Sequence, residues 1–430
     1  MADVLVDRST TSAPDDVGEL GRTPTKLALL VPERDEAEPI VSIVVPALDE
    51  SLTVETFVRW CQEGLAAAGV RGEILIIDSS SDPTPLLALA AGARVLRTPK
   101  RGLGRAYIDA VPYIRGQFVI MGDADCTYDF RQLAPFVERF HEGHEYVMGS
   151  RWAGSIEKGA MPVHHRYFGT PFTTWILNRL YRSHFTDIHC GMRGITLDAL
   201  KRMQIQSQSW EYASEMVLKS VHMELRTAEV PVHFLKDQEG RVSHHRRMGW
   251  FSPFQAAWIN LRAMFVYGAD FFVYRPGIIL MILGTLITMP FIFGPVKVGP
   301  LTFSFYWQFF GGALAVIGLN GYLMGCLAQI FFDYTGRRTA KLLDAFRYTR
   351  TCIAAGAVTL MGIGLMVPLT LKYLDGGLRL TGALQDENYY FLSGVFFVMG
   401  GISLFAFTLL IHAAATATRS MTWRRPPTDA

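Results

Sequence analysis

The chain has 430 residues and a formal net charge of +2, and half of its residues are hydrophobic. This length suggests two or three folded units, and the balanced charge gives no indication of nucleic-acid binding. The five cysteines are scattered and include no Cys-x-x-Cys pair, so the sequence predicts neither a disulfide framework nor a zinc site.

The N-terminal arm differs in composition from the rest of the chain. Acids, Ser, Thr and Pro dominate residues 1–39, and no apolar core of signal-peptide length occurs there. This composition predicts a mostly disordered arm. Residues 27–31 are the exception, because their apolar run suits a short added strand.

Apolar runs and helical patterns alternate between residues 40 and 247. The runs predict strands at 41–45, 73–77, 93–96, 117–121, 146–148 and 229–233. Helical spacing lies between them, for example at 51–68 and 104–115. The alternation predicts an α/β domain with a mostly parallel sheet and helices on both faces. In such sheets, ligands bind at the carboxyl ends of the strands.

Three acids follow the predicted strand at 117–121, in the segment Gly122-Asp-Ala-Asp-Cys-Thr-Tyr-Asp129. One residue separates Asp123 from Asp125, so their oxygens can converge on one divalent cation, and that cation can hold a diphosphate. A solvated turn rich in Asp is the alternative. Asp78 ends the neighbouring predicted strand, which favours a nucleotide divided between these acids.

Five short segments carry a family resemblance. They are, in chain order, Ser42-Ile-Val-Val-Pro-Ala-Leu-Asp-Glu50, the loop that starts at Asp78, Lys100-Arg-Gly-Leu-Gly-Arg-Ala106, Gly122-Asp-Ala-Asp125 and Met148-Gly-Ser-Arg151. Each is weak alone. Together they resemble the GT-A domain of family-2 glycosyltransferases, above all the polyprenyl-phosphate (dolichyl-phosphate) sugar synthases. The resemblance covers residues 40–247 and implies a Rossmann-like GT-A fold.

The resemblance implies which residues bind the sugar donor. The expected nucleotide-sugar site consists of Pro46, Leu48, Glu50, Asp78, Lys100, Gly102 and Asp123. A Mg²⁺ or Mn²⁺ ion is expected at Asp123, Asp125 and Thr127. The dolichyl-phosphate mannose enzymes have Gln at the position of Thr127, and a hydroxyl is a poorer ligand, so water or the diphosphate can complete the shell. The loop that starts at Asp78 lacks the two adjacent Asp residues of the family. Which of these two acids Asp78 corresponds to is therefore left open.

The resemblance also implies an acceptor side. Arg151 and Arg166 are expected to bind a phosphate, because a guanidinium offers planar, bidentate donors. A surface ion pair is the alternative for an isolated Arg. Asp187 lies in a segment similar to the family's Asp-x-x-Ser-Gly-Phe-Arg and is expected to shape this side. Glu215 is either a contact of the sugar or acceptor, or only a helix cap. The predicted catalytic set is Asp123, Asp125 and Arg151.

The remainder of the chain is predicted to meet a membrane. Basic residues at 241–247 precede an aromatic-rich stretch, so residues 248–276 are predicted as amphipathic interfacial helices that Pro276-Gly277 ends. A buried helix of the soluble domain is the alternative. Residues 277–417 are predicted as an all-α domain of four transmembrane helices, with apolar spans at 278–293, 303–331, 351–371 and 390–414.

Charge around the spans predicts their orientation. Basic residues are in excess between 333 and 350 and in the tail at 418–430, whereas 372–387 shows no such excess. By the positive-inside rule, the tail and the GT-A domain are cytoplasmic. The expected location is the plasma membrane, with several crossings.

The predicted reaction moves a sugar from a nucleotide-diphosphate sugar to a polyprenyl phosphate. A phosphate acceptor is already ionised, so no general base is expected, and direct displacement inverts the anomeric centre. The expected partners are these two substrates and the membrane, without nucleic acid and with homo-oligomer formation left open. A processive polysaccharide synthase and a non-catalytic membrane scaffold or translocator are the alternatives. The first normally carries Gln-x-x-Arg-Trp, which this sequence lacks, and the second would be expected to lose the acids.

Overall fold

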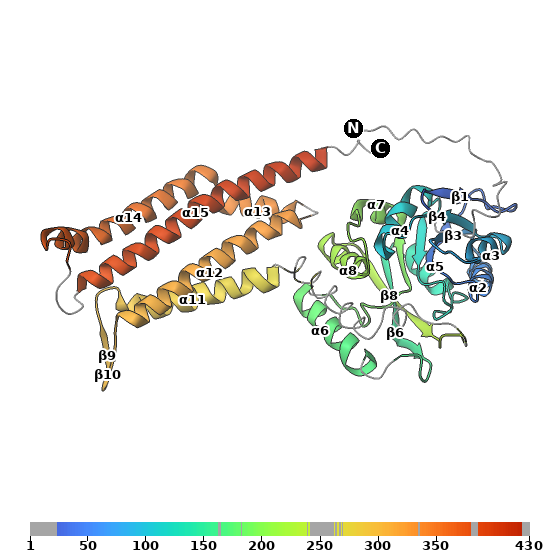
Figure 1. Ribbon diagram of the computed structural model, residues 1–430, viewed down its shortest axis with the longest axis horizontal. Coiled ribbons are helices and arrows are strands. Elements are labelled where there is room, and N and C mark those ends of the chain that lie inside the picture. Colours follow the sequence, from blue (N-terminus) through green and yellow to red (C-terminus); the bar gives the residue numbers. More distant parts are fainter. Residues whose placement is uncertain are drawn as a thin grey trace. The chain divides into compact units, whose positions relative to one another are not determined.

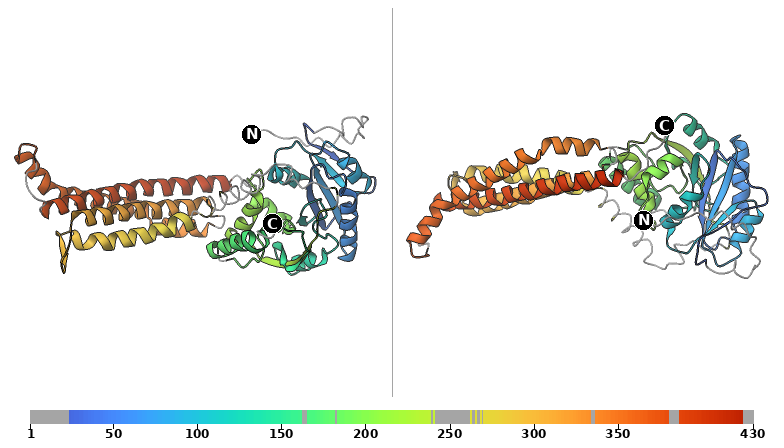
Figure 2. Two further views of the ribbon diagram at one scale, coloured as in Figure 1. Left: turned by 60° about the horizontal axis from the view of Figure 1, so that its bottom comes forward. Right: turned by 90° about the horizontal axis from the view of Figure 1, so that it is seen from above.

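The computed structural model describes residues 24–161, 165–181, 183–238, 270–333, 336–379 and 386–423, together with Gly240, Arg262, Phe265 and Gly268. The chain divides into two compact units, Met1–Met264 and Phe265–Ala430. Figures 1 and 2 show a sheet with surrounding helices in the first unit and long helices in the second. The predicted basic segment and most of the predicted interfacial stretch, as well as residues 1–23, lie outside the described residues.

An eight-stranded mixed sheet forms the first unit, in the order β1-β4-β3-β2-β5-β7-β6-β8. The strands are β1 (Ala28–Leu30), β2 (Val41–Ala47), β3 (Gly72–Asp78), β4 (Arg94–Arg97), β5 (Phe118–Met121), β6 (Tyr146–Ile156), β7 (Arg193–Thr196) and β8 (Thr227–Phe234). The central strands β4, β3, β2 and β5 are parallel to one another, and β7 is antiparallel to both of its neighbours. The prediction of a mostly parallel α/β sheet is confirmed.

Amphipathic helices cover the sheet (Figure 1). They are α2 (Val54–Ala67), α3 (Thr84–Ala90), α4 (Leu103–Ala110), α5 (Ala134–His141), α6 (Thr170–Tyr181), α7 (Leu197–Met203) and α8 (Tyr212–His222), with the short η1 (Val111–Tyr113) and η2 (His165–Gly169). In α2, Val54, Phe57 and Cys61 recur at helical spacing and are fully buried. They join β2 residues such as Ile43 in one apolar core.

Parallel pairing brings the ends of three strands to one edge of the sheet. Ala47 at the end of β2 is in register with Asp78 at the end of β3. Val44, near the end of β2, pairs with Met121, the last residue of β5. The loops that begin after Ala47, Asp78 and Met121 therefore start at the same edge.

Two strands differ from the sequence prediction. β6 continues to Ile156, so Arg151 lies inside this strand, whereas the sequence analysis placed it just beyond a strand ending at 148. The extension carries small and polar residues, which give no apolar run. β7 (Arg-Gly-Ile-Thr) was not predicted for the same reason. Its Gly194 is needed for packing, because a Cβ there would lie 2.6 Å from the Phe140 ring.

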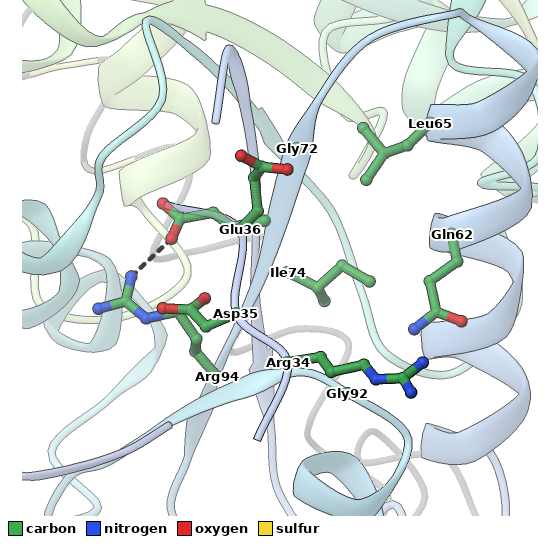
Figure 3. A pocket seen from close by; sticks show the side chains of 10 residues that line it. Arg34, Asp35, Glu36, Gln62, Leu65, Gly72, Ile74, Gly92 and Arg94 are labelled. Atoms are coloured by element: carbon green, nitrogen blue, oxygen red, sulfur yellow. Dashed lines mark hydrogen bonds and ion pairs between the residues drawn. The ribbon is translucent and has the colours of Figure 1, made fainter. Parts of the chain in front are cut away.

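Part of the N-terminal arm belongs to the folded unit. β1 pairs antiparallel with β4, which confirms the predicted added strand. Further along, both oxygens of Asp35 accept hydrogen bonds from Arg115, at 2.7 and 2.8 Å. Arg115 also donates to the buried Glu73 at 2.7 Å. A small pocket beside this network lies at the amino ends of β3 and β4, away from Asp78 (Figure 3).

The second unit consists mainly of helices: α11 (Arg275–Thr288), α12 (Phe305–Phe331), α13 (Arg337–Ala345), α14 (Tyr348–Asp375) and α15 (Asp386–Trp423), with η3 (Asp270–Tyr274), η4 (Met289–Phe291) and a hairpin of β9 (Val296–Val298) and β10 (Leu301–Phe303). Among the described residues, four helices are long and apolar enough to cross a membrane: Phe272–Phe291, Phe305–Phe331, Tyr348–Asp375 and Asp386–Thr418. This confirms the prediction of four apolar helices.

The helix break predicted at Pro276-Gly277 does not occur. The π-helical turn η3 leads directly into α11, and Pro276 lies in the first turn of α11, where a helix does not need the missing N–H. Gly277 continues the helix and is required by packing against α12. A Cβ there would lie 2.3 Å from the backbone nitrogen of Tyr322.

Gly318 on α12 provides a test of this close crossing. A Cβ at Gly318 would lie 2.1 Å from the backbone nitrogen of Met281 on α11. Gly318→Val should therefore force the helices apart and cost about 1–3 kcal/mol of unfolding free energy. Thermal unfolding of the detergent-solubilised protein measures the loss. Gly356→Val on α14 is the control, because a Cβ there meets nothing within 4 Å. Equal melting temperatures for both variants would contradict the close crossing.

Candidate active site

Asp78 is fully buried at the carboxyl end of β3. Its Oδ2 accepts a hydrogen bond from Arg97 Nη1 at 2.7 Å, and its Oδ1 has no hydrogen-bond partner among the described residues. Burial raises the pKa of Asp78 above its ordinary value, although Ser80 and Arg97 act against this rise. A buried oxygen without a donor is rare in a folded protein. It fits a ligand that supplies an N–H or O–H group, as a nucleoside does.

Hydrogen bonds fasten the loop after β2 to the loop after β3. Ser80 Oγ accepts from the backbone N–H of Asp49 at 2.8 Å, and Thr84 Oγ1 accepts from that of Glu50 at 2.9 Å. Asp49 adopts a left-handed conformation with φ of 54°, which turns the chain sharply. The predicted donor residues Leu48 and Glu50 thereby lie on a loop joined to the loop after Asp78, and Pro46 lies within β2 just before it.

The loop after β4 also begins beside Asp78. The backbone N–H of Thr98 donates to the carbonyl oxygen of Asp78 at 2.8 Å. Lys100 follows and is exposed, and Gly102 has a φ of 112°, in the region that favours glycine. The structure therefore brings together the loops of all the predicted donor residues that follow β2, β3 and β4.

The acidic segment after β5 joins the same edge. Thr53 at the start of α2 donates its hydroxyl to the carbonyl oxygen of Ala124 at 3.0 Å. Asp123 and Asp125, on either side of Ala124, are half-buried, so solvent reaches both. Thr127 donates to Asp125 Oδ1 from its backbone at 3.0 Å and from its hydroxyl at 2.6 Å. In the structure Thr127 thus orients Asp125, and its part in metal binding stays a prediction.

Buried tyrosines surround Asp123. Tyr107, Tyr128 and Tyr212 all have a raised pKa, chiefly because they are buried, and the negative charge of Asp123 adds to the rise in each. Gly191 leaves room for the carboxylate, since a Cβ there would lie 2.6 Å from Asp123 Oδ2. The sequence analysis did not identify these tyrosines, which come from separate parts of the chain.

The donor set limits the metal that the site suits. The described residues contain no group of three or more His, Cys, Asp or Glu that could hold a metal ion. Two neighbouring carboxylates with no further acidic ligand suit Mg²⁺, which commonly binds one or two carboxylates and takes its other ligands from water and substrate phosphates. Asp123 and Asp125 therefore fit a hard divalent cation that arrives with a diphosphate.

The structure pairs two of the predicted acceptor residues with each other. Arg151 donates from Nε to Asp187 Oδ2 at 2.6 Å and from Nη2 to Oδ1 at 2.8 Å. Both side chains are buried. Burial acts to lower the pKa of Arg151, but Tyr128 and Asp187 raise it by more. The net pKa lies above the ordinary value, so the guanidinium stays charged. One edge of the Arg151 fork is thus occupied by Asp187.

The third predicted acceptor residue, Arg166, lies elsewhere in the chain, in the turn η2. It is half-buried, and its guanidinium carbon is 5.7 Å from the ring centre of Tyr167. An aromatic face attracts the cation but does not occupy the N–H donors of a guanidinium. The two predicted phosphate ligands therefore differ: Arg151 forms a buried ion pair with Asp187, and the half-buried Arg166 lies beside an aromatic ring.

Helix α6, which follows Arg166, exposes two large aromatic side chains. Thr170 and Thr174 are buried, whereas Phe172 and Trp175 are 60% and 62% exposed. The two exposed rings stack at 6.3 Å. A helix on a soluble domain normally turns its large aromatic side chains toward the core. Exposed apolar surface of this kind marks a contact with a membrane or another protein.

The comparisons agree with this architecture. Residues 42–203 match the family model described as Glycosyl transferase family 2. The low-salt glycan biosynthesis hexosyltransferase Agl6 of Haloferax volcanii is 31% identical over 336 residues, which cover 76% of this chain and 79% of that protein. This chain is a family-2 glycosyltransferase.

More distant relatives share parts of this family-2 glycosyltransferase. The dolichyl-phosphate hexose transferase of Haloferax volcanii is 28% identical and covers 38% of this chain and 70% of its own. The dolichol-phosphate mannosyltransferase of Mycosarcoma maydis is 26% identical and covers 47% and 72%. A solved structure, mannosyl-3-phosphoglycerate synthase from Rubrobacter xylanophilus, is 20% identical and covers 52% and 72%, with a TM-score of 0.41.

The predicted resemblance and the predicted GT-A fold class are confirmed. The transferase keeps the acids at 78, 123 and 125, and apolar helices follow its GT-A domain. Glu215 is a different case. Its carboxylate accepts hydrogen bonds from the backbone N–H groups of Gln206 and Ser207, so in the structure it is directed at the loop before its own helix.

Asp78→Asn tests the role of the unpartnered oxygen in the family-2 glycosyltransferase. The amide keeps an oxygen for Arg97 but presents an N–H group where the ligand needs an acceptor. We expect the KM for the nucleotide sugar to rise about 10-fold to 100-fold, the usual effect of losing a hydrogen bond to a charged group. Glu73→Gln is the control, because Glu73 pairs with Arg94 at the opposite ends of the same strands. An unchanged KM in Asp78→Asn would contradict the donor site.

Proposed function

We propose that this transferase moves a sugar from a nucleotide-diphosphate sugar to a polyprenyl phosphate, with inversion at the anomeric carbon. The observation that carries the proposal is the meeting of Asp78 with Asp123 and Asp125 at one edge of the sheet, in a chain with four membrane-length helices. The names of the relatives that act on dolichyl phosphate support it.

The donor site follows from the loops described above. Asp78 Oδ1 accepts a hydrogen bond from the nucleoside, and the loops after β2 and β4 enclose it. Asp125, oriented by Thr127, and Asp123 would hold a Mg²⁺ or Mn²⁺ ion at the diphosphate. When bound, such an ion neutralises the charge that develops on the leaving nucleoside diphosphate.

The acceptor requires little chemistry from the protein. A phosphate monoester has its second pKa at about 6 and is largely dianionic at neutral pH. One of its oxygens forms the bond to the anomeric carbon while the bond from that carbon to the diphosphate breaks. No proton has to be removed from such an acceptor. The protein aligns the two anions and lowers their repulsion with cationic side chains.

The surroundings of Arg166 support a lipid as the carrier of this phosphate. Arg166 directly precedes α6, whose exposed Phe172 and Trp175 suit the boundary between headgroups and acyl chains. We place the GT-A domain on the cytoplasmic side of the plasma membrane. The basic residues Arg337, Arg338 and Lys341 on α13, between two spans, support that orientation.

A product analysis separates this proposal from its alternatives. The full-length protein in nanodiscs is incubated with a panel of nucleotide sugars and with undecaprenyl or dolichyl phosphate, and the lipids are weighed by mass spectrometry. We expect a single product that is heavier by one sugar. A ladder of masses would instead indicate a processive synthase. A protein that neither transfers nor hydrolyses any donor would indicate a scaffold.

Asp125→Asn removes the charge of Asp125 but keeps an oxygen for Thr127. We expect the turnover number to fall at least about 100-fold, as when a group that stabilises developing charge is lost. Transfer to undecaprenyl phosphate measures the effect. Asp198→Asn is the control, because Asp198 is an exposed acid in a surface pair with Arg202. Full activity in Asp125→Asn would remove Asp125 from the mechanism.

Arg166→Ala tests the acceptor side. Arg151→Ala is less suitable, since it would leave Asp187 buried without its partner. Loss of a charged donor to phosphate should raise the KM for the lipid phosphate about 10-fold to 100-fold and leave the KM for the nucleotide sugar unchanged. Arg139→Ala, at an exposed pair with Glu142, is the control. Equal changes in both KM values would argue against a role in acceptor binding.

A further inference from the structure

A fully buried ion pair on α8 holds the loop at residues 204–209. Glu215 and Lys219 lie one helical turn apart and approach to 2.5 Å. Glu215 accepts from the backbone N–H groups of Gln206 at 2.9 Å and Ser207 at 2.8 Å. Lys219 donates to the carbonyl oxygens of Met203 at 3.1 Å and Gln204 at 2.9 Å. The pair therefore binds the backbone on both sides of the turn after α7.

The same loop lies directly against residues 100–105. A Cβ at Gly104 would lie 2.1 Å from the carbonyl oxygen of Ser207, and one at Gly102 would lie 2.3 Å from that of Gln208. The Gln208 oxygen also accepts from the backbone N–H of Arg105 at 3.0 Å. This bond satisfies one of the N–H groups that the first turn of α4 leaves without a helical partner.

These contacts form one continuous chain from the ion pair to the donor loop. Glu215 and Lys219 fix the backbone of 204–209, and the carbonyl groups of that loop fix the start of α4. Both glycines are needed because the two backbones touch. Lys100 and Gly102, predicted to bind the nucleotide sugar, thus depend for their position on side chains that no substrate reaches.

We infer that Glu215 and Lys219 are positioning residues for the nucleotide sugar, acting through the loop at 204–209. The inference rests on the proposed function, because it takes residues 100–105 to be part of the donor site. It assigns the pair to donor binding and not to the acceptor. It also explains why a charged pair lies in the interior, where apolar residues pack at least as stably.

The test replaces the pair by apolar residues of similar size, Glu215→Leu with Lys219→Met. No unpaired buried charge remains, so the fold is retained, while the backbone at Met203, Gln204, Gln206 and Ser207 loses its hydrogen bonds to the two side chains. The control is Glu73→Leu with Arg94→Met, which removes another buried ion pair, at the amino ends of β3 and β4, together with the hydrogen bonds that Glu73 accepts from Ser42 and Arg115. Both full-length variants are compared with the wild type in nanodiscs.

Two measurements decide the outcome. Hydrogen exchange of the peptide covering 100–106 should become at least about 10-fold faster in the Glu215–Lys219 variant and remain unchanged in the control, since the Arg105 amide loses its fixed acceptor. The KM for the nucleotide sugar should rise about 10-fold, with little change in turnover number or in the KM for the lipid phosphate. Unchanged exchange, or faster exchange with an unchanged donor KM, overturns the inference.

Gly104→Ala is a second way to disturb the contact between the loop at 204–209 and residues 100–105, and it leaves the ion pair intact. Its methyl group displaces Ser207, so it should raise the donor KM by itself and add nothing in the Glu215–Lys219 variant. Additive effects overturn the inference. The exchange measurement needs no substrate. If the wild type transfers no sugar to any polyprenyl phosphate, the proposed function fails, whereas the exchange data still decide whether the pair holds the donor loop.

Discussion

Parallel pairing of β3, β2 and β5 is the constraint on which the site depends. Strands that run in the same direction end at the same edge, so acids far apart in sequence come to that edge. Asp78 follows one strand, and Asp123 and Asp125 follow another. Hydrogen bonds through Ser80, Thr84 and Thr53 then join the loops.

Internal charge pairs hold this arrangement in place. Asp78 with Arg97, Glu73 with Arg94, Arg151 with Asp187, and Glu215 with Lys219 all lie inside the first unit. Removing one partner of such a pair typically costs about 3–5 kcal/mol. A pair also fixes direction, because its oxygens and nitrogens must meet in one geometry. The domain thus fixes the residues around the candidate site with ionic contacts of its own.

Apolar runs in the sequence predicted the buried strands and the acids that follow them. β2, β3 and β5 are covered on both faces, so each appears as an apolar run, and the acids stand out because they follow such runs. The four spans were visible as longer apolar runs, of the length that a membrane crossing needs. The pairing of Arg151 with Asp187 was not predictable, because 36 residues separate them and the pair forms only in the folded sheet. The tyrosines around Asp123 and the inward direction of Glu215 also depend on tertiary packing.

The antiparallel strand β1 has a consequence for the handling of the protein. It covers the outer side of β4, which would otherwise end the sheet with unpaired backbone groups. Such an open edge readily recruits strands from other molecules. Trimming the chain to Val41, where β2 begins, would remove this cover, and the shortened domain would be prone to self-association even though every residue of the candidate site was present.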